Sequence, residues 1–364
     1  MSINRITKSC IQAFVLGLLL MQAAFAESVT IIGSIPQQIK QNTLNSLFNN
    51  KAAAKGERND KTIQLLRVQL SDDMKKIIIG RAHTAFDHSP QFPLTAVQVN
   101  SPALPETVQL GMKNVPVLDQ GYLGTCTTFA VTAALDVSIG KGDYISQLCN
   151  LQLGTYLEHH GYSVSGWEGA YTINVLNQIA QFGIVSKDKQ RTKGCGGMTA
   201  YPYFFRPKPD SFIEPEHFRS MSELLFGTVV NWSDVYQGNN PETTLNNVKE
   251  ALNSGDRLVM SVLLPRTDLG NAGAVGSHNT WLDRDTWVLT AEIIDDIQNA
   301  HAAHALIITG YDDNATAVDY RGKHKGLLIL RNSWGSMVGD WGEFYMSYDY
   351  FKVLAFDVKR FSPN

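Results

Sequence analysis

Residues 119–130 read DQGYLGTCTTFA, and this short stretch governs how the rest of the chain is interpreted. Gln120 stands six positions before Cys126, and the run that starts at Cys126 carries apolar residues at helical spacing until Gly140 can end it. A cysteine in the first turn of a helix faces unpaired N–H groups, which favour the thiolate. Position alone favours the other interpretation, a buried structural cysteine, because free cysteines are among the most buried residues.

Composition narrows the class of protein. The chain has 364 residues, a formal net charge of −3, 44% hydrophobic residues and 18% charged residues. These values suit a folded globular protein of one large domain or two ordinary ones. The charge is nearly balanced and the sequence has no basic run, so we expect neither a nucleic-acid nor a membrane partner.

The first 26 residues have the pattern of a secretory signal. Arg5 and Lys8 precede the apolar run IQAFVLGLLLM, and small residues at 24–26 provide a cleavage site after Ala26. No later stretch reaches the roughly 18 apolar residues of a membrane helix. The sequence therefore predicts a signal peptide over 1–26 and a soluble mature protein that is secreted, either extracellular or periplasmic.

Removal of the signal leaves three cysteines, Cys126, Cys149 and Cys195. In an oxidising compartment thiols tend to pair, and three can form only one bridge. The remaining cysteine is then either a stray residue or a free reactive thiol.

Residues 27–102 differ from the rest of the chain. The runs at 29–35 and 61–71 predict two strands, and Ser71, Asp72 and Asp73 provide cap and first-turn residues for a short helix. The segment 88–106 is rich in proline and predicts an extended conformation.

The remainder predicts an α+β domain with two halves, because its helical segments come before its strands. Helices are expected at 126–142 and 167–184. Strands are expected at 256–264, 304–312, 326–334 and 342–351.

Two further residues complete a possible catalytic set. A nucleophilic thiolate needs a cationic partner that later protonates the leaving amine, and His304 opens a predicted strand. Asn332 lies at the end of another strand, where its amide can orient an imidazole, and Trp334 stands beside it. His301 lies three residues before His304, but a His-x-x-His pair without further ligands is a weak metal signal.

The order of these residues and the short motifs around them resemble those of the papain-like cysteine peptidases. The chain would be an atypical, bacterial-type member of that family. PVLDQGYLGTCTTFA is similar to the family's PVxxQGxCGSCWAFS, HALIITGYD to HAVxxVGYG, and LILRNSWG to xIxKNSWG. WEGAYTINVLNQIAQFGI resembles CNGGxxxxAxxxxxxxGI. The resemblance covers residues 103–364.

The resemblance implies a two-subdomain α+β fold, with a helical left half, an antiparallel β-barrel-like right half and an active-site cleft between them. It implies a secreted cysteine endopeptidase that works through a Cys-His-Asn triad and a thioester, without a metal or other cofactor. Cys126 is the implied nucleophile, His304 the general acid and base, and Asn332 the residue that orients His304. Gln120 and the Cys126 N–H would form the oxyanion hole.

Three more residues are implied to serve the substrate or the triad. Gly169 would run beside an extended peptide, Tyr171 would line the same side of the cleft, and Trp334 would cover the His304–Asn332 pair. The expected partners are polypeptide substrates and the chain's own propeptide, and the expected oligomeric state is a monomer.

The same resemblance makes residues 27–102 a propeptide, with 88–102 laid through the cleft as an intramolecular inhibitor. The β-hairpin and helix expected in this unit come from its own sequence pattern and not from the resemblance, and the alternative is a permanent extra domain. It also implies a Cys149–Cys195 disulfide, which leaves Cys126 free. The family's other bridge is lost, because Leu123 and Trp167 stand where it has cysteines, and we expect an apolar contact there.

Two other functions are consistent with parts of this pattern. An acyl-transferase could use the same triad, although transglutaminase-like enzymes usually orient the histidine with an aspartate, and the residue here is Asn332. A non-catalytic binding protein on a peptidase fold is the other alternative, although inactive relatives tend to lose the nucleophile or the histidine.

Overall fold

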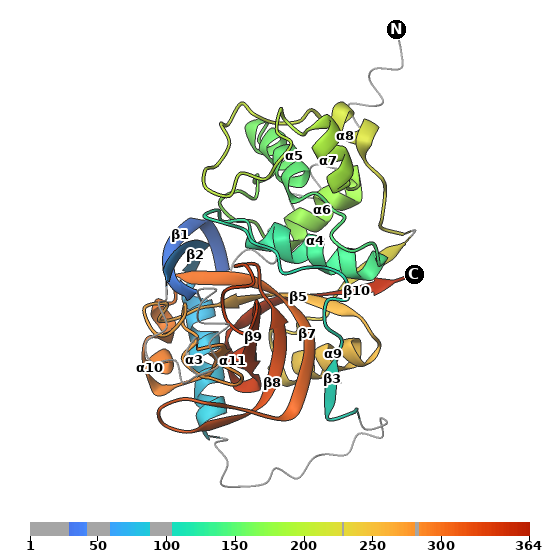
Figure 1. The fold of residues 1–364 in the computed structure, drawn as a ribbon. Helices are drawn as coiled ribbons and strands as arrows, with labels where there is room; N and C mark the ends of the chain where they lie inside the picture. The colour runs from blue at the N-terminus through green and yellow to red at the C-terminus, as the bar shows by residue number, and fades with distance from the viewer. Residues whose placement is uncertain (1–28, 42–58, 88–103, 228, 281–283) are drawn as a thin grey trace.

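The computed structural model describes residues 29–41, 59–87, 104–227, 229–280 and 284–364. The predicted signal peptide and the segment 88–102 lie outside these residues. The described chain has the α+β fold with two halves that the sequence predicts, one mainly helical and one built on a large sheet (Figure 1). No helix within the described ranges is long and apolar enough to cross a membrane.

The sheet half is built around two buried neighbouring strands, β5 (Arg257–Leu263) and β7 (Ala302–Val318). The remaining strands of the main path are β4 (Val230–Asp234), β6 (Thr286–Trp287), β8 (Lys323–Arg331), β9 (Glu343–Ser347) and β10 (Ala355–Pro363). Their order is β4-β10-β5-β7-β8-β9-β6, and the pairs are antiparallel except β6 with β9. The strands predicted at 256–264, 304–312 and 326–334 are confirmed.

The strand predicted over 342–351 is only half correct. It ends at Ser347, whose hydroxyl accepts a hydrogen bond from the Tyr350 N–H and so caps α11 (Tyr348–Leu354). A serine N-cap outweighs the strand preference of the aromatic residues that follow it.

The helical half contains the helix predicted to begin at Cys126. Its helices are α4 (Cys126–Ile139), α5 (Gln147–His159), α6 (Thr172–Phe182), α7 (Lys187–Lys193) and α8 (Pro215–Met221). Gly140 ends α4 in a left-handed conformation, as predicted. The helix predicted at 167–184 begins later, at Thr172, because Gly166 and Gly169 form an isolated bridge with positive φ angles before it.

The N-terminal unit has the predicted strand–strand–helix order. β1 (Val29–Gln41) and β2 (Asn59–Leu70) form an antiparallel hairpin, which α3 (Asp72–Asp87) follows. Arg81 of α3 donates to the carbonyls of Val353 and Ala355, which fixes the helix on the sheet half. The hairpin lies where the two halves meet (Figure 1).

The hairpin and its neighbours extend the central sheet. β2 pairs with β7 at Leu66–Ala303 and Arg67–Ala302, and β3 (Thr107–Gln109) pairs with a later part of β7. α9 (Pro241–Asn253), α10 (Ala291–Asp295) and the 3₁₀ turn η1 (Ile297–Asn299) complete the sheet half. β7 therefore pairs with two separate parts of the N-terminal third of the chain, β2 near its start and β3 further along.

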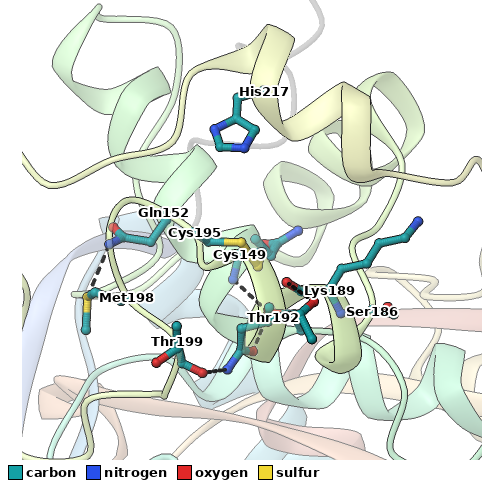
Figure 2. Close-up of a disulfide and its surroundings, with 12 residues drawn as sticks. Cys149, Gln152, Ser186, Lys189, Thr192, Cys195, Met198, Thr199 and His217 are labelled. Atoms are coloured by element: carbon teal, nitrogen blue, oxygen red, sulfur yellow. Dashed lines mark hydrogen bonds between the residues drawn. A yellow bond between two sulfur atoms is a disulfide. The ribbon is translucent and has the colours of Figure 1, made fainter.

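A disulfide joins Cys149 of α5 to Cys195, just after α7 (Figure 2). This is the pair that the resemblance implied, and Cys126 is the free cysteine of the described chain. Leu123 and Trp167 lie in one buried apolar cluster, as expected for the position of the missing second bridge. The Trp167 indole N–H donates to the Thr155 hydroxyl, so its polar atom is also satisfied.

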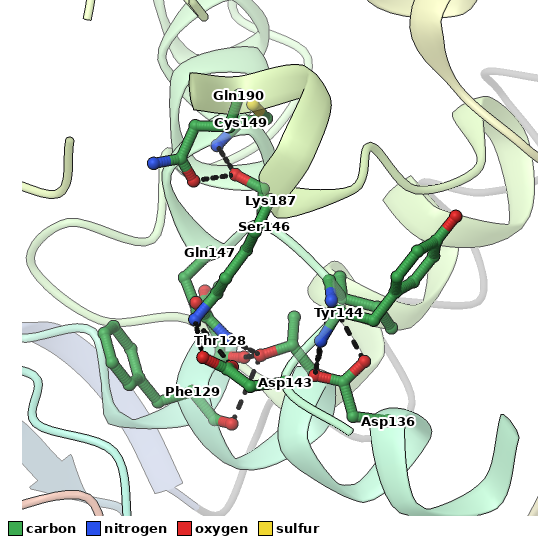
Figure 3. A network of polar contacts seen from close by, with 12 residues as sticks. Thr128, Phe129, Asp136, Asp143, Tyr144, Ser146, Gln147, Cys149, Lys187 and Gln190 are labelled. Atoms are coloured by element: carbon green, nitrogen blue, oxygen red, sulfur yellow. Dashed lines mark hydrogen bonds and ion pairs between the residues drawn. The ribbon is translucent and has the colours of Figure 1, made fainter. Parts of the chain in front are cut away.

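A polar network fixes α4 against its neighbours (Figure 3). The buried Asp136 carboxylate accepts hydrogen bonds from the backbone N–H groups of Tyr144 and Ile145, at 3.2 and 3.0 Å. Nearby, Ser146 caps α5 by accepting from the Cys149 N–H, and it donates to Gln190 of α7. The helix that carries Cys126 is thus held at its far end by side-chain contacts to backbone.

Replacement of Asp136 with asparagine should make the stability of the chain less dependent on pH. Burial raises the pKa of the Asp136 carboxyl to about 8, against hydrogen bonds from Ile145 that lower it. The unfolded chain releases this proton near pH 4, so the stabilising contribution is present below about pH 4 and is lost as the pH rises to about 8. We expect the wild-type free energy of unfolding, measured with denaturant, to fall by about 2 kcal/mol or more relative to Asp136→Asn between pH 5 and pH 8. A constant difference across this range would contradict the assignment.

Candidate active site

Cys126 is the first residue of α4 and is completely buried. Thr125 occupies the N-cap position, but its hydroxyl contacts the Tyr201 hydroxyl at 2.8 Å instead of capping the helix. Burial raises the pKa of the Cys126 thiol to about 11. Hydrogen bonds from Ala305 and Thr127 lower this pKa, but their effect is smaller than that of burial. Burial of Cys126 therefore opposes the thiolate that its position at the start of α4 favours.

The structure brings His304 of β7 to Asn332, which follows β8. Their Nε2 and Oδ1 atoms are 2.8 Å apart, and the backbone N–H of Ser333 donates to the same Oδ1 at 2.7 Å. Because a backbone N–H can only donate, Oδ1 is the acceptor, and the His304 proton must lie on Nε2. The other ring nitrogen, Nδ1, is then a free base. It is buried and has no hydrogen-bond partner among the described residues.

Burial also acts on the histidine. It lowers the pKa of His304 to about 4, although the hydrogen bond to Asn332 acts in the opposite direction. The Trp334 ring stacks on His304 with ring centroids 4.6 Å apart and 26° between the planes, and it keeps water from the His304–Asn332 bond. Trp287 and Phe344 pack edge-on against Trp334 and hold it in place.

Gln120 presents its amide N–H groups to the same region. Its Nε2 donates to the carbonyls of Leu123 at 2.8 Å and of Gln64 in β2 at 3.1 Å. Its Oε1 accepts from the Ser333 hydroxyl at 2.8 Å, which fixes the orientation of the amide. Sequence reasoning did not identify Ser333, although its place directly after Asn332 is a usable signal.

The hairpin occupies the cleft at the residues expected to bind substrate. A Cβ placed on Gly169 would lie 2.9 Å from Leu66 Cδ2 and 3.0 Å from Ile31 Cγ2. The Tyr171 hydroxyl accepts from the Ile31 N–H at 3.1 Å and donates to the Val29 carbonyl at 3.0 Å. The sequence expected residues 88–102 here. They lie outside the described residues, so that expectation stays a prediction, and the contacts observed among the described residues come from β1 and β2.

The whole chain was compared with family models, curated proteins and solved structures. No family model matches the chain. No curated protein matches it either. The chain is similar in fold to several solved structures, and three of them follow.

Xylellain, a cysteine protease from Xylella fastidiosa, is 21% identical over 71% of this chain and 87% of its own, with a TM-score of 0.46. Digestive procathepsin L 3 from the larval midgut of Tenebrio molitor is 18% identical over 79% and 78%, with a TM-score of 0.45. The ragweed pollen cysteine protease Amb a 11, in its proform, is 16% identical over 72% and 67%, with a TM-score of 0.45. The roles of the site residues rest instead on the contacts described above.

A second residue of the site, after Ser333, has no counterpart in the sequence predictions. Lys61 of β2 places its Nζ 2.8 and 2.7 Å from the two carboxylate oxygens of Asp119, and 2.7 Å from the Trp334 carbonyl oxygen. A lysine in a predicted strand gives no sign of such a partner, because the pairing depends on tertiary structure.

His301 does not share the environment of His304. Its side chain is exposed and its ring contacts the Asn299 carbonyl, whereas its own backbone carbonyl accepts from the Val68 N–H of β2. Within the part of the chain that the structure describes, no three His, Cys, Asp or Glu side chains gather as a metal site.

Proposed function

We propose that the chain is a secreted cysteine endopeptidase that is made as a zymogen. The observation that carries this proposal is the fixed tautomer of His304. Because Asn332 Oδ1 accepts from both the Ser333 N–H and His304 Nε2, the imidazole keeps an unprotonated and unpartnered Nδ1 in the buried region that also holds Cys126. This arrangement suits a base that takes the proton of a thiol.

The proposed reaction starts once the cleft is open. His304 Nδ1 takes the Cys126 proton, and the thiolate attacks the carbonyl carbon of the peptide bond. The oxygen that becomes negative accepts from the Gln120 Nε2–H and from the Cys126 backbone N–H at the start of α4. His304 then gives its Nδ1 proton to the departing amine, which leaves a thioester that water hydrolyses with His304 as the base.

The proposed inhibitor is the hairpin. The Gln64 carbonyl of β2 lies on the Gln120 amide, where the oxygen of a substrate would accept the same hydrogen bond. Cys126 and His304 are both completely buried. Both a substrate and solvent are therefore excluded until β1 and β2 leave, and the neutral thiol and imidazole belong to this excluded state.

A self-processing experiment tests the function. We expect the full chain, incubated with a reductant, to shorten to a product that begins near residue 103 and to react with a peptidyl epoxide at one thiol. Cys126→Ala should stay intact and unlabelled under the same conditions, because it lacks the nucleophile. A wild-type chain that neither shortens, nor cleaves an added unfolded protein, nor takes the label would favour a non-catalytic binding protein instead.

A further inference from the structure

We propose that the cleft contains a ready-made site for a lysine side chain of the substrate, formed by the Asp119 carboxylate and the Trp334 carbonyl. This inference rests on the proposed peptidase function and adds a substrate preference to it. In the covered state Lys61 of the hairpin fills the site. Its Nζ has three oxygen acceptors within 2.7–2.8 Å, and its side chain is only 12% exposed.

The site is set by the backbone around it and does not depend on Lys61. The Gly121 N–H donates to Asp119 Oδ1 at 2.9 Å, and Asp119 and Trp334 form an isolated antiparallel bridge. On either side of that bridge the Gln120 N–H donates to the Ser333 carbonyl at 2.8 Å, and the Gly335 N–H donates to Leu118 at 3.0 Å. Both acceptor groups therefore keep their positions when the hairpin leaves.

The same backbone contacts tie the site to the catalytic residues. Asp119 directly precedes Gln120, and Trp334 is the residue whose ring stacks on His304. A substrate side chain that reaches these oxygens belongs to a residue close to the bond that is cleaved.

The course of β2 shows on which side of that bond the site lies. The strand passes from Lys61 at Asp119, through Gln64 at Gln120, to Leu66 at Gly169. Gly169 and Tyr171 are the residues proposed to hold the part of the substrate that becomes the acyl group. Lys61 marks the opposite, leaving-group side. An extended strand rises about 3.3 Å per residue, so Lys61 is about 10 Å from Gln64, and we assign the site to the second or third residue after the cleaved bond.

The acceptors suit a cationic side chain. The two oxygens of Asp119 lie on one side of the Lys61 ammonium group, and the Trp334 carbonyl oxygen accepts from another of its donors. Lysine is the side chain that the covered state already places there, and it is the one we assign to the site. When the hairpin leaves, the Asp119 carboxylate loses the cation with which it is paired. A neutral substrate side chain would leave the Asp119 carboxylate without a paired cation.

Matched peptides test the preference. Two fluorogenic peptides differ only in lysine or norleucine at the second and third positions after the cleaved bond, and the enzyme is the full chain after self-processing. We expect kcat/KM to be about tenfold higher for the lysine peptide, in line with a hydrogen-bonded charge pair in a partly buried site. The ratio should fall to about one in Asp119→Asn, whose Oδ1 can still accept from Gly121.

A matched control and a second measurement separate the possible failures. Asp143→Asn removes a carboxylate between α4 and α5 that binds Lys187 through both oxygens, at 2.6 and 2.7 Å, and should keep the tenfold ratio. In the intact chain, Lys61→Met should increase the rate of Cys126 labelling by about tenfold, and should add nothing in an Asp119→Asn background.

Equal cleavage of both peptides by the wild-type enzyme would overturn the lysine site and leave the peptidase function standing. Absence of cleavage of either peptide, without labelling of Cys126, would overturn the function itself. In that case the labelling experiment on Lys61→Met cannot report through Cys126, and protection of β2 amides from hydrogen exchange replaces it. Unchanged protection in Lys61→Met would then overturn the site, and reduced protection that depends on Asp119 would support it.

Discussion

Replacement of His304 with alanine is expected to lower kcat/KM for any peptide by at least about a thousandfold. The structure gives the reason: His304 Nδ1 is the unpartnered base in the buried region of Cys126, and the Asn332 bond keeps the other nitrogen protonated. Without the imidazole, Cys126 has no group to take its proton and no group to protonate the leaving amine. The measurement is steady-state hydrolysis of a fluorogenic peptide, with the variant and the wild type both shortened near residue 103 by an added protease that is then removed.

His301→Ala is the matched control for this variant. The two histidines are three residues apart, but the His301 side chain is exposed and bonds only locally, to the Asn299 carbonyl. We expect its kcat/KM to stay within about twofold of the wild type. If His304→Ala keeps a tenth of the wild-type activity, or if His301→Ala loses activity to the same extent, the assignment of the base is wrong.

Replacement of Leu66 with aspartate is expected to open the cleft of the intact chain and to increase the rate of Cys126 labelling by at least about a hundredfold. Leu66 is completely buried, and its Cδ2 atom lies against Gly169. A carboxylate in this apolar contact costs several kcal/mol, and that cost falls on the state in which the hairpin is seated. Labelling of Cys126, which is completely buried, requires the hairpin to leave, so its rate follows the open population.

The neighbouring residue supplies the control. Arg67 lies on the same strand with its side chain exposed, so Arg67→Asp introduces the same group without burying it. We expect less than about a threefold change in the labelling rate. Far-UV circular dichroism of both variants checks that the rest of the chain is folded. Equal labelling rates in the two variants would show that the hairpin does not control access to Cys126.

The sequence was sufficient to choose the residues that meet at the site. Cys126 begins a predicted helix, and His304 and Asn332 lie in predicted strands. Gln120 lies in the loop before the helix, and the order of the motifs links it to the other three. The helix start at Cys126 and the strands around His304 and Asn332 have clear apolar periodicity. For such segments local and tertiary preferences agree.

The sequence was not sufficient to predict contacts between segments that are far apart along the chain. The hairpin contacts Gly169 and Tyr171, and nothing in the pattern of β1 or β2 specifies that destination. The Lys61–Asp119 pair and the raised pKa of Cys126 both depend on tertiary packing, which brings β2 to Asp119 and buries the thiol. Helix position alone predicted a thiolate, and the loss of solvent outweighs it.

The pairing of β2 with β7 has a consequence for how the protein is made and stored. β7 carries His304, and the residues just before it, Ala302 and Ala303, find their backbone partners in Arg67 and Leu66 of β2. Departure of the hairpin leaves this part of β7 as an open strand edge beside an apolar surface, a feature that invites association between molecules. Because β2 is synthesised before β7, it is available to cover this edge as soon as β7 folds.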